Sequence, residues 1–432
     1  MVASDVHNRA AQVGHGDLDP LGGSAARQAA IFWVIGLVLL LAAALPDGGV
    51  TQIVRQAAIS GSMVALLYFI LVSTPRNSAI PYLLFFSISF TSLFGITKTL
   101  TGSHAVSTNI LVYGLSFYTA TLAYHYANRD LNIGTGIHAA NPMLLFTGPI
   151  ATLVTAHRTT GLRRRAAYYL PFALIGAFFY KIIAAPLGLY LWMIDYTEPI
   201  RALQFAFIFE LFVYFNFAGL SLLVFGVLGV IGLRVPLNFR QPFSARNLID
   251  FWKGWHISLS TVLKTLFYTP TRAVLGSAGA LFVVYISSAL WHGVTFNFVL
   301  WGAFHAATFW ATIHLLKARQ ALLATFLMIF AVVYGRMLFA DSDTARLLSK
   351  LAFWAEHAAI TVEPRIPRAA QISLVLAVLL VAMEFLLRDL RLFRQRCYKY
   401  LRTPAAQIVM ILLFALLIQS DGGADYAVYG QR

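Results

Sequence analysis

The chain has 432 residues, of which 59% are hydrophobic and 11% are charged, and its mean hydropathy is +0.73. Soluble domains carry about 25% charged residues, so this composition excludes a soluble globular protein and a disordered one and predicts a membrane protein. The net charge of +15 arises from Lys and Arg in short loops between apolar runs, which is typical of the cytoplasmic face of a membrane protein. We therefore expect no binding to nucleic acid.

In chain order, residues 1–28 are polar and lack the basic start and short apolar core of a cleavable signal, so we expect a flexible tail. A single membrane domain is predicted for residues 29–420, because neither a linker nor an internal repeat divides them. Residues 421–432 form a short C-terminal tail. The lone cysteine, Cys397, excludes a thiolate zinc cluster within one chain, and we assign no metal ligands.

Apolar runs of membrane length follow one another along the predicted domain. They predict an all-α, polytopic integral membrane protein with about 11–12 transmembrane helices, plus buried or re-entrant helices. The runs lie at 31–45, 57–73, 79–96, 106–126, 141–156, 167–193, 202–232, 274–291, 294–315, 321–340, 370–387 and 405–419.

Two basic clusters predict the orientation of these spans, because loops rich in Lys and Arg stay in the cytoplasm. One cluster lies between residues 158 and 165, and the other lies between residues 388 and 402. Counting spans from either cluster places the basic segment 234–272 on the inside as well. The run 141–156 contains a Gly-Pro pair, and if this run is re-entrant, the orientation of everything before it inverts.

Three short stretches with histidine carry the polar chemistry of an otherwise apolar chain. A titratable side chain at membrane depth costs free energy, so its presence indicates function. Histidine is the side chain that most readily takes a proton from a hydroxyl near neutral pH. The stretches are FWKGWHISLS at Phe251–Ser260, SALWHG at Ser288–Gly293 and WGAFHA at Trp301–Ala306.

From the residues alone, the roles of these histidines stay open. His256 and His292 fit either a hydrogen bond between packed helices or proton transfer. The tryptophans that flank His256 fit an aromatic anchor at the membrane interface. His305 fits helix packing better than catalysis. Glu210, well inside an apolar run, fits a protonated or hydrogen-bonded helix contact better than a proton relay.

Several motifs occur in a fixed order along residues 105–340. Gly114–Thr119 reads GLSFYT, Thr147–Ile150 reads TGPI, Leu237–Phe243 reads LNFRQPF and Asp250–Ser260 reads DFWKGWHISLS. In this order they resemble signature elements of the membrane-bound O-acyltransferase family, in the bacterial branch that includes the alginate O-acetylation and teichoic-acid D-alanyl transfer proteins. Two stretches depart from the family pattern: Asn216–Leu222 lacks both acidic residues of D-F-S-G-Y-S-D, and Tyr268–Arg272 replaces Y-I-P-L-G-G. The resemblance is thus specific for the family and not for the substrate.

The resemblance implies that the helices surround a central tunnel. It also implies that an acyl group, with acetyl as the expected one, passes from a cytoplasmic thioester to an extracytoplasmic hydroxyl. The acceptor is expected to be a cell-surface polysaccharide or exopolysaccharide. His292 is expected to act as general base, and His256 to orient or polarise the reacting groups. Substrate contacts are expected from Trp255, Trp291, Asn238, Trp252, Ser260 and His305.

The same resemblance implies an acyl-CoA or acyl-phosphopantetheine carrier protein as donor, and no tightly bound cofactor. Such a donor would be drawn to a basic cytoplasmic surface, although the same residues equally serve as orientation determinants: Lys253, Lys264, Arg240 and Arg246. The expected partners are membrane lipids, the donor, and an extracytoplasmic transferase or polysaccharide-synthesis protein. The expected location is the bacterial inner membrane.

Three alternatives remain open at this point. The chain could pass acyl groups to a separate extracytoplasmic transferase, or it could acylate a lipid or a protein side chain. A proton-coupled transporter is the least favoured alternative. It predicts polar residues along several spans and paired broken helices, whereas this chain concentrates its polar signals in one third of its length.

Overall fold

A computed structural model describes residues 71, 79–86, 117, 119–131, 155–156, 161–191, 199–341, 343–352, 366–389, 400 and 403–419. The chain in these ranges is almost entirely helical, which confirms the all-α prediction, and the strands are a two-residue ladder between β1 (Thr155–Ala156) and β2 (Leu233–Arg234). The helices are α4 (Ile80–Phe85), α10 (Leu162–Phe178), α11 (Ala185–Leu191), α12 (Pro199–Ile231), α13 (Leu248–Gly254), α14 (Ile257–Leu263), α15 (Thr269–His292), α16 (Phe296–Lys317), α17 (Ala321–Ala340), α18 (Thr344–Leu351), α19 (Arg368–Asp389) and α21 (Pro404–Gln419).

Six helices of the described part are long and apolar enough to cross a membrane. Five of them agree closely with the predicted runs: Arg164–Leu191, Arg201–Ile231, Phe296–Lys317, Ala321–Ala340 and Arg368–Leu386. The predicted runs 31–45, 57–73, 79–96, 106–126 and 141–156 lie wholly or largely outside the described residues, as do both predicted tails. The polytopic architecture is therefore confirmed, and its full number of spans stays a prediction.

The sixth helical stretch differs from the prediction. We expected a break near residue 272 and a span at 274–291, but the helix begins at Ile257 and continues to His292. A π-helical turn, η3 (Lys264–Tyr268), joins α14 to α15 without interrupting the helix. Pro270 follows directly after this π-helical turn and does not end the helix.

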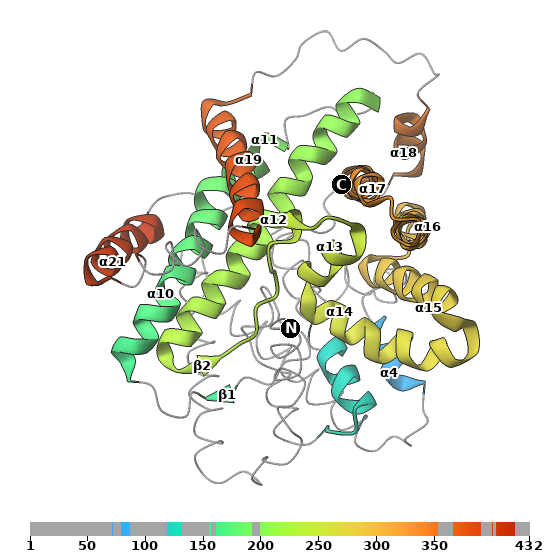
Figure 1. Cartoon of the computed structure of the whole chain (residues 1–432), viewed down its shortest axis with the longest axis horizontal. Coiled ribbons are helices and arrows are strands. Elements are labelled where there is room, and N and C mark those ends of the chain that lie inside the picture. The colour runs from blue at the N-terminus through green and yellow to red at the C-terminus, as the bar shows by residue number, and fades with distance from the viewer. Residues whose placement is uncertain are drawn as a thin grey trace, which may run out of the picture.

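A sharp bend divides this long helix at Gly276. The residue has φ 67° and ψ −179°, a conformation that is essentially restricted to glycine. Figure 1 shows α14 running outward to a corner and α15 turning back from it. The bend returns the end of α15 to the region where α14 begins.

Helix α12 is the centre of the described fold. It packs along α10, and Figure 1 shows these two helices side by side with α21 on the outer side of α10. Glycines permit this close packing, since a Cβ on Gly176 would lie only 2.6 Å from the carbonyl oxygen of Gly219. Arg165 donates from Nε to the carbonyl oxygen of Val230 (3.0 Å), which satisfies a backbone acceptor in the last turn of α12.

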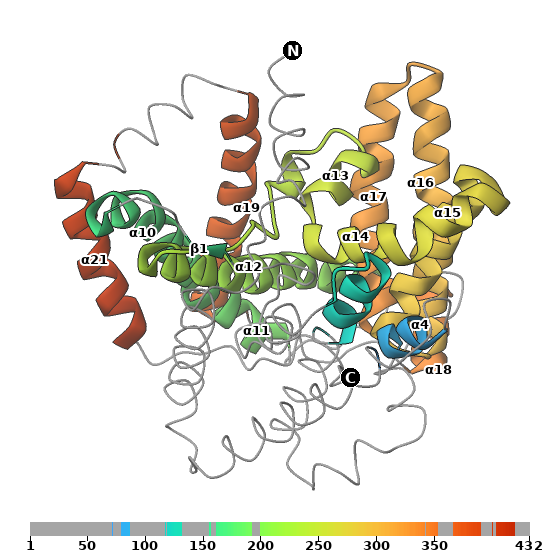
Figure 2. The same ribbon diagram turned by 90° about the horizontal axis from the view of Figure 1, so that it is seen from below.

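A second group of helices lies against the other end of α12. Figure 2 shows α16 and α17 upright and side by side, with α12 running across their direction. The short helix α13 contacts both α16 and α17. Asn247 begins α13 as an N-cap, because its Oδ1 accepts a hydrogen bond from the backbone N–H of Asp250 (3.0 Å). This corner of the fold, between α13 and α17, contains the histidine motifs.

Candidate active site

A cavity of about 460 Å³ lies among α12, α13, α14, η3, α15, α16 and α17. Its walls are mainly aromatic and aliphatic, and its polar side chains are few. His256 and His292 both line it, although 35 residues of bent helix connect them. The described structure therefore brings the two predicted catalytic histidines onto one cavity within the helical body.

His256 lies at the N-cap of α14 in a left-handed backbone conformation (φ 42°, ψ 56°). Its Nδ1 accepts a hydrogen bond from the backbone N–H of Leu259 at 3.4 Å. Because Nδ1 is the acceptor, the neutral ring carries its proton on Nε2. Among the described residues Nε2 has no hydrogen-bond partner, so this N–H remains available as a donor.

Asn238 holds the start of α14 in place. Its backbone oxygen accepts from the N–H of Ile257 (2.9 Å). Its side-chain Oδ1 accepts from the backbone N–H (3.1 Å) and the hydroxyl (2.8 Å) of Ser258. Asn238 does not line the cavity, so the structure gives it a positioning contact to the turn that carries His256, and its predicted contact with substrate stays a prediction.

His292 is the last residue of α15. Its ring packs against Trp291 and Phe339, each with ring centroids 4.9 Å away, and against Trp301 at 6.1 Å. The carbonyl end of a helix carries partial negative charge, which stabilises a cation there. Burial among aromatic rings and the nearby charge of Arg336 outweigh this effect and favour the neutral imidazole, which is the form that a general base needs.

Three of the six predicted substrate contacts line the cavity: Trp252, Trp255 and Ser260. Trp255 is buried and stacks on Phe251 at 5.4 Å, which fixes this wall. Ser260 is exposed and lies with Lys253 and Lys264, so these residues form the solvent-facing side of the lining. The cavity therefore has a polar, basic mouth and an aromatic interior.

Trp291 and His305 lie behind the cavity wall. Trp291 contacts the rings of both catalytic candidates, at 6.4 Å from His256 and 4.9 Å from His292. His305 is buried and packs against Trp252 at 5.3 Å and Trp301 at 4.8 Å. Direct contact of these two side chains with substrate stays a prediction.

Sequence reasoning missed Arg336, the charged residue in the interior of the cavity. Arg336 lies on α17, and its Nε donates to Oε2 of Glu210 on α12 at 2.5 Å. This contact agrees with the hydrogen-bonded interpretation of Glu210. A signal was available in the sequence, because Arg336 is a charge inside a predicted span and such charges indicate function.

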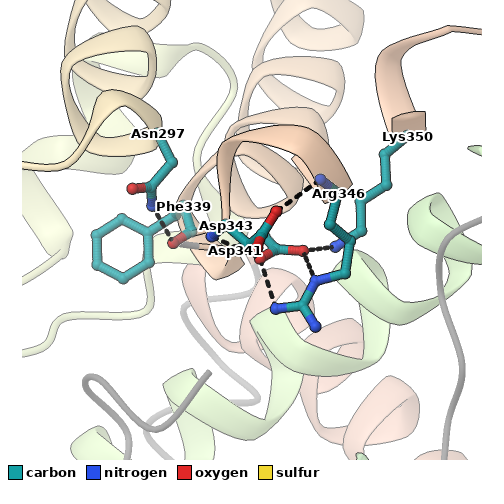
Figure 3. A network of polar contacts seen from close by, with 6 residues as sticks. All are labelled: Asn297, Phe339, Asp341, Asp343, Arg346 and Lys350. Atoms are coloured by element: carbon teal, nitrogen blue, oxygen red, sulfur yellow. Dashed lines mark hydrogen bonds and ion pairs between the residues drawn. The ribbon is translucent and has the colours of Figure 1, made fainter. Parts of the chain in front are cut away.

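Figure 3 shows an ionic cluster at the end of α17. Asp341, at the end of α17, accepts from Nε of Arg346 at 2.6 Å and from Nζ of Lys350 at 2.5 Å. Burial would raise the pKa of Asp341, but the hydrogen bonds from Arg346 and Lys350 outweigh burial and lower it. Asn297 donates to the backbone oxygen of Phe339 (3.0 Å), the residue whose ring packs on His292.

The described residues thus define a multi-pass helical membrane protein with two histidines on one cavity. Residues 191–334 match the model of MBOAT, the membrane-bound O-acyltransferase family. The matched segment includes His256, His292 and all six predicted substrate contacts. This segment of the chain is therefore similar to the membrane-bound O-acyltransferase family, in agreement with the motif resemblance.

Several relatives align with part of this chain. The protein named "Probable alginate O-acetylase AlgI" of Pseudomonas aeruginosa is 38% identical over 96 residues, which cover 21% of this chain and 18% of that protein. The peptidoglycan O-acetyltransferase of Helicobacter pylori is 34% identical over 96 residues, covering 21% and 18%. The teichoic acid D-alanyltransferase of Bacillus subtilis is 27% identical over 124 residues, covering 26% and 31%. The alignment spans less than a third of each of these relatives.

Proposed function

We propose that this protein is a membrane-bound O-acyltransferase of the bacterial inner membrane. It moves an acyl group, acetyl in the simplest case, from a cytoplasmic thioester to a hydroxyl of an extracytoplasmic polysaccharide. The observation that carries the proposal is that His256 and His292 line one cavity inside the segment that matches the family. The names of the relatives support transfer of acetyl or alanyl groups to cell-surface polymers.

The two histidines have different tasks in the proposed reaction. His292 takes the proton of the acceptor hydroxyl as the hydroxyl oxygen attacks the thioester carbonyl carbon. The carbon–sulfur bond breaks, the ester forms, and the thiolate receives the proton from His292. His256 donates a hydrogen bond from Nε2 to the carbonyl oxygen as negative charge develops there.

The surroundings of the histidines support this chemistry. Aromatic walls such as Trp255 and Phe339 limit the access of water, which would otherwise hydrolyse the thioester. The exposed Lys253 and Lys264 at the mouth supply positive charge for the phosphates of CoA or for an acidic carrier protein. We assign the mouth to the donor for this reason.

The test of the proposal is the loss of an acyl ester from surface glycans. His292→Ala should lower transfer by about 10²–10⁴-fold, the usual contribution of a general base, with normal insertion and protein level. Mass spectrometry of glycans from cells that carry the wild type or the variant identifies the ester that disappears. His314→Ala is the matched control, because His314 is exposed on α16 and does not line the cavity. Near wild-type acylation by His292→Ala would show that another group is the base.

The proposed donor is tested in inside-out membrane vesicles. Labelled acetyl-CoA added outside such vesicles should yield labelled glycan inside them. An acyl carrier protein tested in the same way distinguishes the two donors. An acyl relay would instead give labelled glycan only after a separate extracytoplasmic transferase is added.

A further inference from the structure

The cavity holds a buried positive charge that the reaction described above does not use. Arg336 lies inside the candidate span Ala321–Ala340, lines the cavity, and has a side chain that is only 12% exposed. A guanidinium at membrane depth is expensive unless its charge and its N–H groups are satisfied. The groups that pair with the Arg336 guanidinium therefore indicate which kind of ligand the cavity binds.

The hydrogen bonding of Arg336 is incomplete within the described part of the chain. A guanidinium has five N–H donors, and here Nε uses one of them on Glu210. No other hydrogen bond of Arg336 is found among the described residues, so the fork formed by its Nη1 and Nη2 groups has donors left for a ligand. A carboxylate that served only to neutralise Arg336 would be expected to accept from two of its N–H groups at once, whereas Glu210 accepts from one.

Aromatic rings hold the guanidinium in a defined position. Its Cζ lies 5.0 Å from the ring centroid of Phe339, 5.7 Å from that of Phe209 and 6.0 Å from that of Trp255. Cation–π contacts of this kind fix the plane of the group without using its N–H donors. Arg336 is therefore oriented in advance of ligand binding, and Phe339 joins it to His292.

The charges of the lining have one sign. Lys253, Lys264 and Arg336 line the cavity, and no Asp or Glu is among its described lining residues. Glu210 pairs with Arg336 from α12, is 5% exposed, and does not line the cavity. An anionic ligand would complete the Nη hydrogen bonds, whereas a neutral one would leave a buried cation with weaker acceptors.

We propose that Arg336 is the anion-binding residue of the cavity and that it holds a carboxylate or phosphate group of the substrate. The inference rests on the proposed function only in taking this cavity as the substrate site. The anion has two possible sources, which are the phosphates of a CoA-type donor and the acidic groups of a polysaccharide acceptor.

Binding measurements on the full-length protein in detergent test the proposal without turnover. The probes are CoA, phosphate-free pantetheine, an oligosaccharide of uronic acids, and a neutral oligosaccharide of equal length. The variant is the double substitution Arg336→Gln with Glu210→Gln, which removes both charges and lets two amides keep the contact between α12 and α17. Its thermal unfolding should stay close to that of the wild type. Its affinity for an anionic probe should fall about 10–100-fold, the range for losing hydrogen bonds to a charged group.

Lys317→Gln is the matched control, since Lys317 is an exposed cation at the end of α16 and does not line the cavity. Its effect on affinity should be small and should vanish at high salt, as screening predicts for an exposed charge. The effect of the double substitution should persist at high salt.

The pattern of affinities identifies the source of the anion. A loss confined to CoA assigns Arg336 to the donor phosphates, and a loss confined to the acidic oligosaccharide assigns it to the acceptor. The proposal is overturned if the double variant binds both anionic probes like the wild type, or if the wild type prefers neither over its neutral counterpart. His292→Ala separates this inference from the proposed function, because that variant should lose transfer and keep anion binding.

Discussion

His256 combines two features that a single substitution can separate. Its backbone has positive φ, which costs most residues free energy but suits Asn and glycine better. Its side chain caps α14 through Nδ1 and presents an N–H on Nε2 at the cavity. A structural role needs the backbone and the cap, whereas a catalytic role needs the far nitrogen of the ring.

His256→Asn should therefore keep the fold and lose the reaction. Asn tolerates the left-handed conformation and can cap a helix, so the melting temperature should stay near that of the wild type. Transfer should fall about 10²–10³-fold, the usual cost of removing one donor to a developing oxyanion. His256→Ala should lower both transfer and stability, the latter by about 1–2 kcal/mol through the lost cap. A purely structural His256 would instead leave the Asn variant active in the glycan ester assay.

The histidines could be predicted from the sequence because a titratable residue in an apolar run is visible without a fold. Arg336 and Glu210 could not be paired in this way, since 126 residues separate them and only the crossing of α12 and α17 brings them together. Glu384 is a similar case: it lies near the end of a predicted span and accepts a hydrogen bond from Tyr214 of α12. Single buried charges are readable in a sequence, but their partners are not.

At the level of elements, the bend at Gly276 determines where the second histidine lies. An added Cβ would meet nothing within 4 Å at this residue, so the requirement for glycine is one of backbone conformation and not of space. Val274 and Leu275 beside the bend are exposed, and the corner is not held by packing against other described residues. The backbone of one residue therefore carries the change of direction.

Gly276→Ala should reduce both stability and activity, because its strain cannot be relieved by moving a neighbour. The expected cost is about 1–3 kcal/mol, the range for a residue forced into a sparsely populated conformation. Thermal unfolding in detergent and the glycan ester assay measure the two effects. Gly161→Ala is the matched control, since Gly161 has ordinary φ and open space around it, and it should behave nearly like the wild type. Equal behaviour of the two variants would mean that the bend is not needed.

Helix boundaries followed from the sequence where an apolar run ends in polar residues. The runs 202–232 and 321–340 agree with the candidate spans Arg201–Ile231 and Ala321–Ala340 to within a residue because polar residues flank them in the sequence. The start at Ile257 was missed because Lys264, Pro270 and Arg272 interrupt the apolar pattern without interrupting the helix. The bend was missed because the sequence around Gly276 does not reveal the sign of φ.

At the scale of the whole molecule, the ionic cluster in Figure 3 fastens the end of α17 to α18. Asp341 is fully buried and Lys350 is 1% exposed, so neither charge can be left unpaired without a large cost. Phe339, two residues before Asp341, is fixed by Asn297 and packs on His292. The stability of this corner and the placement of the His292 ring are therefore linked.

The cluster should make the stability of the protein depend on acid pH. The folded pKa of Asp341 is below its ordinary value of 3.8, so its stabilising contribution is present above that value and is lost as the pH falls through the lower folded pKa. Asp341→Asn should cost about 3–5 kcal/mol at pH 7, because it leaves the buried Lys350 uncompensated. The difference from the wild type should shrink once the pH is well below 3.8.

Thermal unfolding measured from neutral to acid pH checks this expectation. Asp250→Asn is the matched control, because its partner Lys253 is largely exposed and such pairs contribute about 0–1 kcal/mol. A constant difference between Asp341→Asn and the wild type across the pH range would contradict the assigned role.

The fold class and the similarity of residues 191–334 to the family could be predicted because composition and the order of motifs are visible in the sequence alone. The cavity could not be, since its lining comes from six helices and from the turn of a long bent one. Membrane composition also hides which faces are buried, because lipid-facing and core-facing positions are both apolar. The tunnel was therefore expected from the family resemblance. The residues that line the cavity depend on how the helices pack, and the sequence does not show this packing.

Because the helix bends at Gly276, a rotation of α15 about this residue would move His292, which lies at the end of the helix. Sixteen residues of helix form an arm about 24 Å long, so a rotation of roughly 10° at the pivot would move the imidazole by about 4 Å. Displacements of only about 1 Å can slow an enzyme a hundredfold. The contact of Gly302 on α16 with Tyr285 and Ala289 on α15 braces the arm partway along its length. In the proposed reaction, the position of the His292 ring would therefore depend on Gly276 and Gly302, which lie away from the reacting atoms.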